Sequence, residues 1–280
     1  MKRILITGAG SYIGTSFENY LKQWKDIYSV DTVDMIDGSW REKDFSGYDV
    51  VFHVAGIAHR KETEENKHLY YEVNRDLAIE TAEKAKNESV GAFILLSSMS
   101  VYGKDVGVIN RATKPAPVSN YGISKLQAEE CIAPLASDNF KVCIIRPPMV
   151  YGKGCKGNFN SVVKIVKRSP IFPKISNQRS MIYIDNLCGF VRLAIDESLD
   201  GVFMPQNKEK MNTSQMAGLI SSALGKHILL DPISGAAVSV MRKCSQKARK
   251  AFGTLVYEDT ETFDYSYCTV STEESVTKSV

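Results

Sequence analysis

The sequence predicts an α/β protein built on a doubly wound parallel sheet. An apolar run over residues 3–7 leads into a glycine-rich turn, and apolar residues then recur at helical spacing. More apolar runs follow, with helical segments between them. Strands that alternate with helices in this way favour a parallel sheet whose crossovers are helices. A chain of 280 residues is long enough to bury a large core. The later runs span residues 27–33, 49–56, 92–96 and 142–145.

The glycine-rich turn lies between the first strand and the first helix, at residues 8–14. Glycines there let the backbone turn tightly and approach a pyrophosphate, which the N-terminus of the following helix attracts. The spacing departs from the usual pattern, because the third glycine comes one position late. The turn predicts a bound dinucleotide that contacts Gly8, Gly10, Ser11, Tyr12, Ile13 and Gly14.

Acidic residues occur near the end of the second predicted strand. Asp31 lies about 20 positions after the glycine turn, where a carboxylate can bind the adenosine ribose diol and repel a 2′-phosphate. We therefore predict NAD as the cofactor and Asp31 as its ribose ligand, with Asp34 in reserve. A solvated carboxylate at a strand end is the alternative.

The third predicted strand ends in small residues. Ala55 and Gly56 leave room at the edge where an open parallel sheet binds its ligand, so Ala55 is a predicted cofactor contact. His53 precedes them inside an apolar run. We interpret His53 as a hydrogen-bonded structural histidine rather than a ligand.

A Tyr-x-x-x-Lys pattern lies in a predicted helix. Tyr121 and Lys125 are four residues apart, so their side chains lie on one helix face. An ammonium close to a phenol favours the phenolate, which could accept a proton from an alcohol. The pattern also occurs on ordinary exposed helices, so its meaning depends on the rest of the chain.

The composition changes after residue 152. Residues 153–179 are rich in Gly, Pro, Lys and Asn, and the helices predicted beyond them begin near Asp185 and at Asn212 or Thr213. We expect a dinucleotide-binding domain of residues 1–152 plus about 180–200. A smaller α/β substrate-binding region would comprise residues 153–179 plus 201–280. The last thirty residues show no clear pattern.

Composition and charge argue against several classes of protein. The net charge is only +3, which does not support a nucleic-acid or anionic-membrane partner. The chain has no apolar run of membrane-spanning length and no signal-peptide pattern at its start, so we expect a cytoplasmic protein without a membrane partner. Its six cysteines lack metal-site spacing, which predicts free thiols, several of them buried, and no metal.

Taken together, seven stretches resemble the extended short-chain dehydrogenase/reductase family, and within it the nucleotide-sugar epimerase/dehydratase branch. The resemblance covers residues 1 to about 205 and implies a Rossmann fold that binds NAD. One departure is that Ser11 stands where the family has its middle glycine. The matching stretches are residues 7–14, 53–56, 73–74, 97–103, 121–125, 146–152 and 179–187.

The resemblance also implies roles for individual residues. Ser98 matches the family's catalytic Ser/Thr, with Ser100 as a less favoured stand-in. Tyr121 would be the acid/base, and Lys125 would lower its pKa and hydrogen-bond the nicotinamide ribose. Asn74 matches an asparagine that supports the site, and we count it with the cofactor-binding residues.

Substrate contacts are implied in the same way. Arg179 matches a basic residue that binds the substrate's diphosphate, and Asn158 lies where further contacts to that diphosphate are common. Ser98 would contact the sugar. The stretch from Arg146 to Phe159 looks most like the branch that handles N-acetylated or 6-deoxy sugars linked to UDP.

The implied reaction is hydride transfer at the sugar's C4, with a UDP-sugar as the expected substrate. We predict an NAD-dependent 4-epimerase. The alternative is an NAD(P)H-dependent 4-keto reductase of a UDP- or dTDP-linked sugar, and a non-catalytic dinucleotide-binding protein is a further possibility. A dehydratase is disfavoured because Met99 and Ser100 occupy the positions of the family's Asp-Glu pair. Analogy with the family suggests a homodimer.

Overall fold

The computed structural model of this chain describes residues 1–58, 62–258 and 265–280. The chain divides into two compact units, each made of separate stretches of sequence. The first unit consists of Met1–Gly103, Pro115–Pro147 and Cys188–Pro205. The second consists of Lys104–Lys114, Pro148–Leu187 and Gln206–Val280.

A six-stranded sheet in the order β10-β6-β4-β3-β1-β2 forms the centre of the first unit. Every pairing in it is parallel. The winding reverses at β1, which lies between β2 and β3, and open sheets of this kind bind ligands beyond the carboxyl ends of the strands at such a reversal. The strands are β1 (Lys2–Thr7), β2 (Tyr28–Val33), β3 (Val50–His53), β4 (Ala92–Leu96), β6 (Lys141–Ile145) and β10 (Gly201–Phe203).

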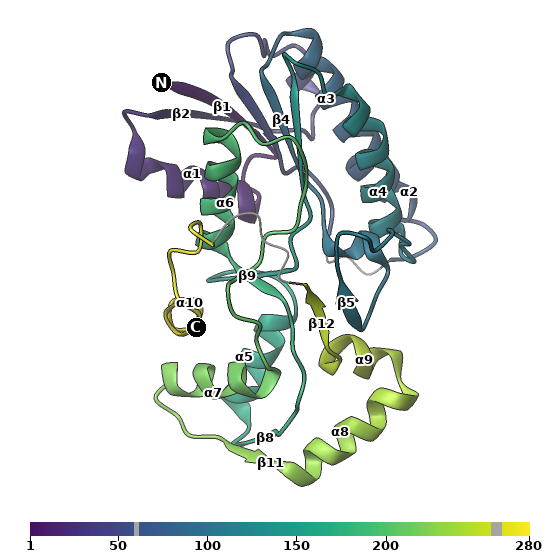
Figure 1. Ribbon diagram of the computed structural model, residues 1–280, viewed down its shortest axis with the longest axis vertical. Coiled ribbons are helices and arrows are strands. Elements are labelled where there is room, and N and C mark those ends of the chain that lie inside the picture. Colours follow the sequence, from purple (N-terminus) through teal and green to yellow (C-terminus); the bar gives the residue numbers. More distant parts are fainter. Residues whose placement is uncertain (59–61, 259–264) are drawn as a thin grey trace. The chain divides into compact units, whose positions relative to one another are not determined.

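Helices cover both faces of this sheet, with α1 and α6 on one side and α3 and α4 on the other (Figure 1). Serine side chains cap two of them: Ser11 begins α1 and Ser119 begins α4. The helices are α1 (Tyr12–Leu21), α2 (His68–Tyr71), the π-helical turn η3 (Glu72–Asp76), α3 (Leu77–Asn87), α4 (Asn120–Ile132) and α6 (Ile184–Asp196). Short 3₁₀ turns are η1 (Lys22–Trp24), η2 (Ser39–Arg41), η4 (Met99–Tyr102) and η5 (Ala133–Leu135).

The core of the first unit explains why its central strands β3 and β4 are almost continuously apolar. A parallel sheet covered on both faces has no exposed side, so alternation is lost. Leu5, Val51 and Phe93 are fully buried and pack in one cluster with Trp40 and Phe45. Full burial of a side chain of this size contributes about 1.5–3 kcal/mol.

In its described residues, the second unit contains three small parallel pairs of strands and five complete helices. Arg179 links two of the pairs, since it forms a bridge with Leu255 of β12 and lies two residues before the start of β9. The pairs are β5 (Gly107–Ile109) with β12 (Leu255–Tyr257), β7 (Met149–Tyr151) with β9 (Met181–Tyr183), and β8 (Ile171–Pro173) with β11 (Leu229–Asp231). The helices are α5 (Asn158–Arg168), α7 (Thr213–Ala223), α8 (Pro232–Cys244), α9 (Gln246–Phe252) and α10 (Thr272–Ser279).

The structure confirms the doubly wound parallel sheet and refines several elements. The sequence placed residues 201–280 in the second region, but β10 pairs with β6 and so lies in the first unit. Residues 104–114 lie in the second unit because β5 pairs with β12. Asn212 rather than Thr213 caps α7, in a capping box with Gln215.

The cysteines agree with the prediction of free thiols, several of them buried. All six are free thiols. Cys143, Cys155 and Cys188 are buried, whereas Cys131 and Cys244 are exposed. On the helix α4 that carries Cys131, Ala128 and Ile132 are the fully buried apolar side chains.

Candidate active site

The glycine turn brings the end of β1 against the end of β3. Gly8 has a φ of +83°, and a Cβ built on it would lie 2.9 Å from Cα of Ala55. Only glycine fits so close an approach. Ser11 begins α1 and accepts a hydrogen bond at Oγ from the Gly14 N–H, at 3.3 Å. Tyr12 and Ile13 form the first turn of α1, where N–H groups have no acceptor within the helix and can bind an anion.

Gly8→Ala is expected to lower both stability and dinucleotide affinity. The new methyl group would meet Ala55 and would also strain a positive φ, and overpacking of this kind costs about 1–3 kcal/mol. Gly10→Ala is a matched control for stability, because Gly10 also has a positive φ (+74°) but no atom within 4 Å of the new methyl group. Thermal melts and NAD titrations of both variants would test this. Equal losses of stability for the two variants would refute the close-approach argument.

Asp31 is exposed near the end of β2, and its position is fixed by Tyr48. The Tyr48 hydroxyl donates to Asp31 Oδ2 at 2.8 Å. Asp34, by contrast, stabilises the local turn, because its Oδ1 accepts from the Ile36 N–H at 2.9 Å. This arrangement leaves Asp31 as the first choice for a ribose ligand.

His53 is completely buried at the end of β3, and its ring contacts β1. The Thr7 hydroxyl lies 2.9 Å from His53 Nδ1, between residues that are direct partners in the sheet register. Burial, with a smaller contribution from the Lys125 charge, lowers the pKa of His53 to about 3. A neutral, hydrogen-bonded ring of this kind supports the interpretation of His53 as structural.

Asn74 lies in the π-helical turn η3 and holds the backbone that follows β3. Its Oδ1 accepts from the Ile57 N–H at 2.8 Å, and its Nδ2 donates to the Ile57 carbonyl at 3.1 Å. Nδ2 also lies 3.4 Å from Ser124 Oγ on α4. Asn74 is fully buried, so these contacts occur away from water. π-Helical turns often mark functional sites. Here the turn directs the Asn74 side-chain amide toward the Ile57 backbone, in the loop after β3.

Ser98 and Tyr121 come together from β4 and α4. A hydrogen bond with Ser98 favours the Tyr121 phenolate, but burial has the larger effect and raises the pKa of Tyr121 above its ordinary value of 10.0. The role of Lys125 in lowering this pKa stays a prediction. Ser98 Oγ also accepts from the Ser100 N–H at 3.1 Å, which fixes the serine at the start of η4.

Lys125 is buried one helical turn beyond Tyr121. Its ammonium donates to the carbonyl of Leu96, the last residue of β4, at 2.9 Å. A Cβ on Gly56 would lie 3.4 Å from the same ammonium. Burial lowers the pKa of Lys125 to about 8, although the Glu129 carboxylate acts in the opposite direction. Lys125 is thus held between the ends of β3 and β4.

A buried ion pair lies behind Lys125, and sequence reasoning did not single it out. Glu129 accepts hydrogen bonds from the Arg146 guanidinium, with Nε 3.0 and 3.1 Å from the two carboxylate oxygens. Glu129 also accepts from the Ser97 hydroxyl, and Arg146 donates to the Tyr102 hydroxyl at 2.8 Å. The network ties α4 to β4, β6 and η4. One sequence feature could have indicated this network: Glu129 lies four residues after Lys125, so both side chains are on the same helix face.

The predicted substrate residues lie in the second unit. Asn158 is exposed at the first position of α5. Arg179 is partly buried and donates from Nη1 to the Gly253 carbonyl at 3.1 Å. Burial lowers the pKa of Arg179, and the Asp105 charge opposes this.

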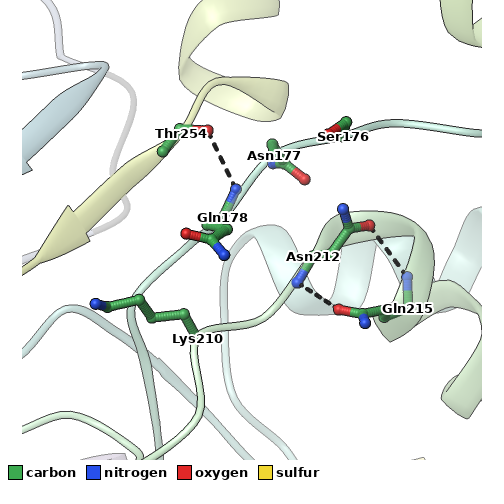
Figure 2. A pocket seen from close by; sticks show the side chains of 7 residues that line it. All are labelled: Ser176, Asn177, Gln178, Lys210, Asn212, Gln215 and Thr254. Atoms are coloured by element: carbon green, nitrogen blue, oxygen red, sulfur yellow. Dashed lines mark hydrogen bonds between the residues drawn. The ribbon is translucent and has the colours of Figure 1, made fainter.

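A polar pocket of about 390 Å³ lies next to Arg179 along the chain (Figure 2). The Gln178 N–H donates to Thr254 Oγ1 at 3.2 Å, and Asn212 caps the helix on the other side. Amide and hydroxyl groups dominate the lining, with one ammonium. The pocket is lined by Ser176, Asn177, Gln178, Lys210, Asn212, Gln215 and Thr254.

Comparison with known proteins gives consistent results. Residues 4–203 match the NAD dependent epimerase/dehydratase family. The UDP-glucose 4-epimerase of Vibrio cholerae is 32% identical over 251 residues, which are 80% of this chain and 76% of that protein. The UDP-2-acetamido-2,6-beta-L-arabino-hexul-4-ose reductase of Pseudomonas aeruginosa is 27% identical over 194 residues, 66% of this chain and 47% of that protein.

A solved structure shares the fold along nearly the whole chain. The UDP-glucuronic acid 4-epimerase of Bacillus cereus, crystallised with NAD, superposes with a TM-score of 0.75 at 21% identity, over 99% of this chain and 97% of that one.

The predictions about membrane spans and about the cofactor can be compared directly with the structure and with these relatives. In the described part of the chain, every helix falls short of the length and apolar character that a membrane crossing requires. The predicted cofactor, NAD, is confirmed as the one on which the matched family depends. Because that match spans most of the sequence, this chain belongs to the NAD dependent epimerase/dehydratase family.

Proposed function

We propose that this chain is an NAD-dependent 4-epimerase of a nucleotide-linked sugar, with Tyr121 as the general acid/base. One observation carries the proposal. The hydroxyls of Ser98 and Tyr121 are paired, and the Lys125 ammonium, one helical turn beyond Tyr121, is bonded to the Leu96 carbonyl at the end of β4. All strands of the sheet are parallel, so their carboxyl ends lie at one edge. The end of β4 and the glycine turn after β1 therefore lie at the same edge of the sheet.

The residues around the turn fit NAD. Gly8 permits the close approach of backbone to backbone, and Tyr12 and Ile13 offer N–H groups for a pyrophosphate. Asp31 offers a carboxylate for the ribose diol at the end of β2. Bound NAD supplies a hydride acceptor for the sugar carbon and, after reduction, a hydride donor.

The protein's own groups handle the proton and the positions of the reactants. Tyr121 takes the proton of the C4 hydroxyl and later returns it, while Ser98 hydrogen-bonds the same oxygen. Lys125 places a positive charge near this oxygen and is oriented by Leu96. Asn74 holds the Ile57 backbone at the edge of the site. Positioned acid/base groups contribute about 10²- to 10⁴-fold to rate.

The substrate we propose is a UDP-sugar, with the second unit as its binding region. Support comes from the V. cholerae and B. cereus proteins, both of which act on UDP-linked sugars by name. Arg179 would bind the diphosphate, with Asn158 as a further contact. The adjacent pocket, rich in amides and containing Lys210, suits a polar ligand.

A 4-keto reductase is the second candidate. It is favoured by the P. aeruginosa relative, whose name specifies reduction of a 4-keto sugar linked to UDP. The same Ser98, Tyr121 and Lys125 would serve both reactions. The two differ in the fate of the cofactor, since an epimerase restores its NAD in each turnover and a reductase consumes a reduced nicotinamide.

The deciding experiment incubates the purified chain with a panel of UDP- and dTDP-linked sugars and their 4-keto forms. If the chain is an epimerase, we expect an epimeric product and no net change in the absorbance of reduced nicotinamide. Stoichiometric consumption of NADH would establish the reductase instead. A marked preference for NADPH would refute the role of Asp31. Binding of NAD without turnover of any sugar would favour a non-catalytic protein.

A further inference from the structure

Helix α8 in the second unit has apolar residues on both of its faces. Its inner face packs closely, because a Cβ on Gly235 would lie only 2.2 Å from the Lys174 carbonyl oxygen, and Val238 is 6% exposed. The outer face is also apolar. Ile233 is 82% exposed, Val240 63% and Met241 49%. The outer residues, which we name the α8 face, are Ile233, Ala236, Ala237, Val240, Met241 and Cys244.

The spacing of the α8 face places its members on one side of the helix. Intervals of three, four, seven, eight and eleven residues from Ile233 recur on one stripe of a helix with 3.6 residues per turn. Scattered exposed aliphatic residues are normal on protein surfaces, but a continuous stripe that faces solvent marks an interaction site. Figure 1 shows α8 at the border of its unit, next to α9.

Basic residues surround one end of this stripe. Between Pro232 and Tyr257 the sequence contains five Lys or Arg residues (242, 243, 247, 249 and 250) and no Asp or Glu. Lys243 and Lys250 are exposed. Arg249 donates from Nη1 to the Lys243 carbonyl at 3.3 Å, which keeps the basic part of α9 beside the end of α8. The mild net charge of the whole chain conceals this local concentration.

We propose that the α8 face docks peripherally on an anionic lipid surface. A helix that lies in a membrane interface needs an apolar side for the acyl boundary and cationic groups for the phosphates, and α8 with α9 offers both. Pairing with a second copy in a parallel two-fold contact fits less well, because it would bring the two basic helix ends together. A single 13-residue helix, about 20 Å long, also provides little area for a stable dimer.

Flotation of the full chain with lipid vesicles tests this proposal without any substrate, so the result is independent of the proposed enzymatic activity. We expect binding to vesicles of equal parts phosphatidylcholine and phosphatidylglycerol, little binding to phosphatidylcholine alone, and weakening with added salt. Ile233→Asp and Val240→Asp should each lower binding about tenfold. Lys243→Ser should lower it about fivefold.

Ile36→Asp serves as the matched control, because Ile36 is 91% exposed in the first unit, and its binding should equal that of the unaltered chain. Circular dichroism melts confirm that each variant is folded. No binding to anionic vesicles would overturn the proposal, as would binding that Val240→Asp leaves unchanged. A dimer in light scattering that Val240→Asp converts to a monomer would show that the face pairs with a second copy, and would overturn it as well.

Discussion

Tyr121→Phe is expected to lower turnover by about 10³-fold while leaving NAD affinity within a factor of two to three. The substitution removes the hydroxyl that we propose exchanges a proton with the sugar, but keeps the ring that packs against Tyr70, with centroids 6.4 Å apart. Steady-state kinetics on the active sugar, together with an NAD titration, would measure both quantities. A variant that retains turnover would exclude Tyr121 as the acid/base.

Two further variants make this test specific. Tyr20→Phe removes a hydroxyl from a partly exposed tyrosine on α1 and should leave turnover unchanged. Ser98→Ala should also reduce turnover, and its combination with Tyr121→Phe should cost little more than Tyr121→Phe alone. Groups that act as a unit are strongly non-additive. Additive losses would place Ser98 and Tyr121 in separate steps.

Glu129→Ala is expected to lower the free energy of unfolding by about 3–5 kcal/mol, because it leaves the Arg146 guanidinium buried without its counter-charge. Glu129 is only 3% exposed and Arg146 9%. The effect should appear in urea denaturation as a lower midpoint with an unchanged slope. Glu130→Ala is the matched control, because the adjacent Glu130 is exposed. Its loss should lower the free energy of unfolding by less than about 0.5 kcal/mol.

A compensating pair distinguishes loss of the ion pair from loss of packing. Glu129→Leu with Arg146→Met removes both charges and should recover most of the stability, since apolar replacement of a buried pair is often neutral. Glu129 also raises the pKa of Lys125. In Glu129→Gln the pKa of Lys125 should therefore fall below about 8, and the loss of activity at high pH should begin at lower pH. An unchanged pH profile would contradict this coupling.

Local patterns predicted much of the first unit. The apolar run at 92–96 coincides with β4, and the glycine turn lies between β1 and α1 as its spacing indicated. The Tyr-x-x-x-Lys pattern lies on α4, and Asp31 on β2. These features depend on residues close together in the sequence, so periodicity and turn chemistry are enough to find them. The π-helical turn around Asn74 had no such local signal, because it depends on contacts with Ile57 and Ser124.

The sequence by itself determined the fold class, the family and the residues of the glycine turn and the Tyr–Lys pair. Tertiary structure decided which groups surround them. Burial raised the pKa of Tyr121, the pair of Glu129 and Arg146 joined residues 17 positions apart, and β10 was drawn into the main sheet beside β6. Three-residue strands and an outward apolar stripe on α8 also carry no distinctive local signal. The physical reason is that burial, ion pairing and strand pairing depend on neighbours supplied by distant parts of the chain, whereas helical and strand periodicity depends on adjacent ones.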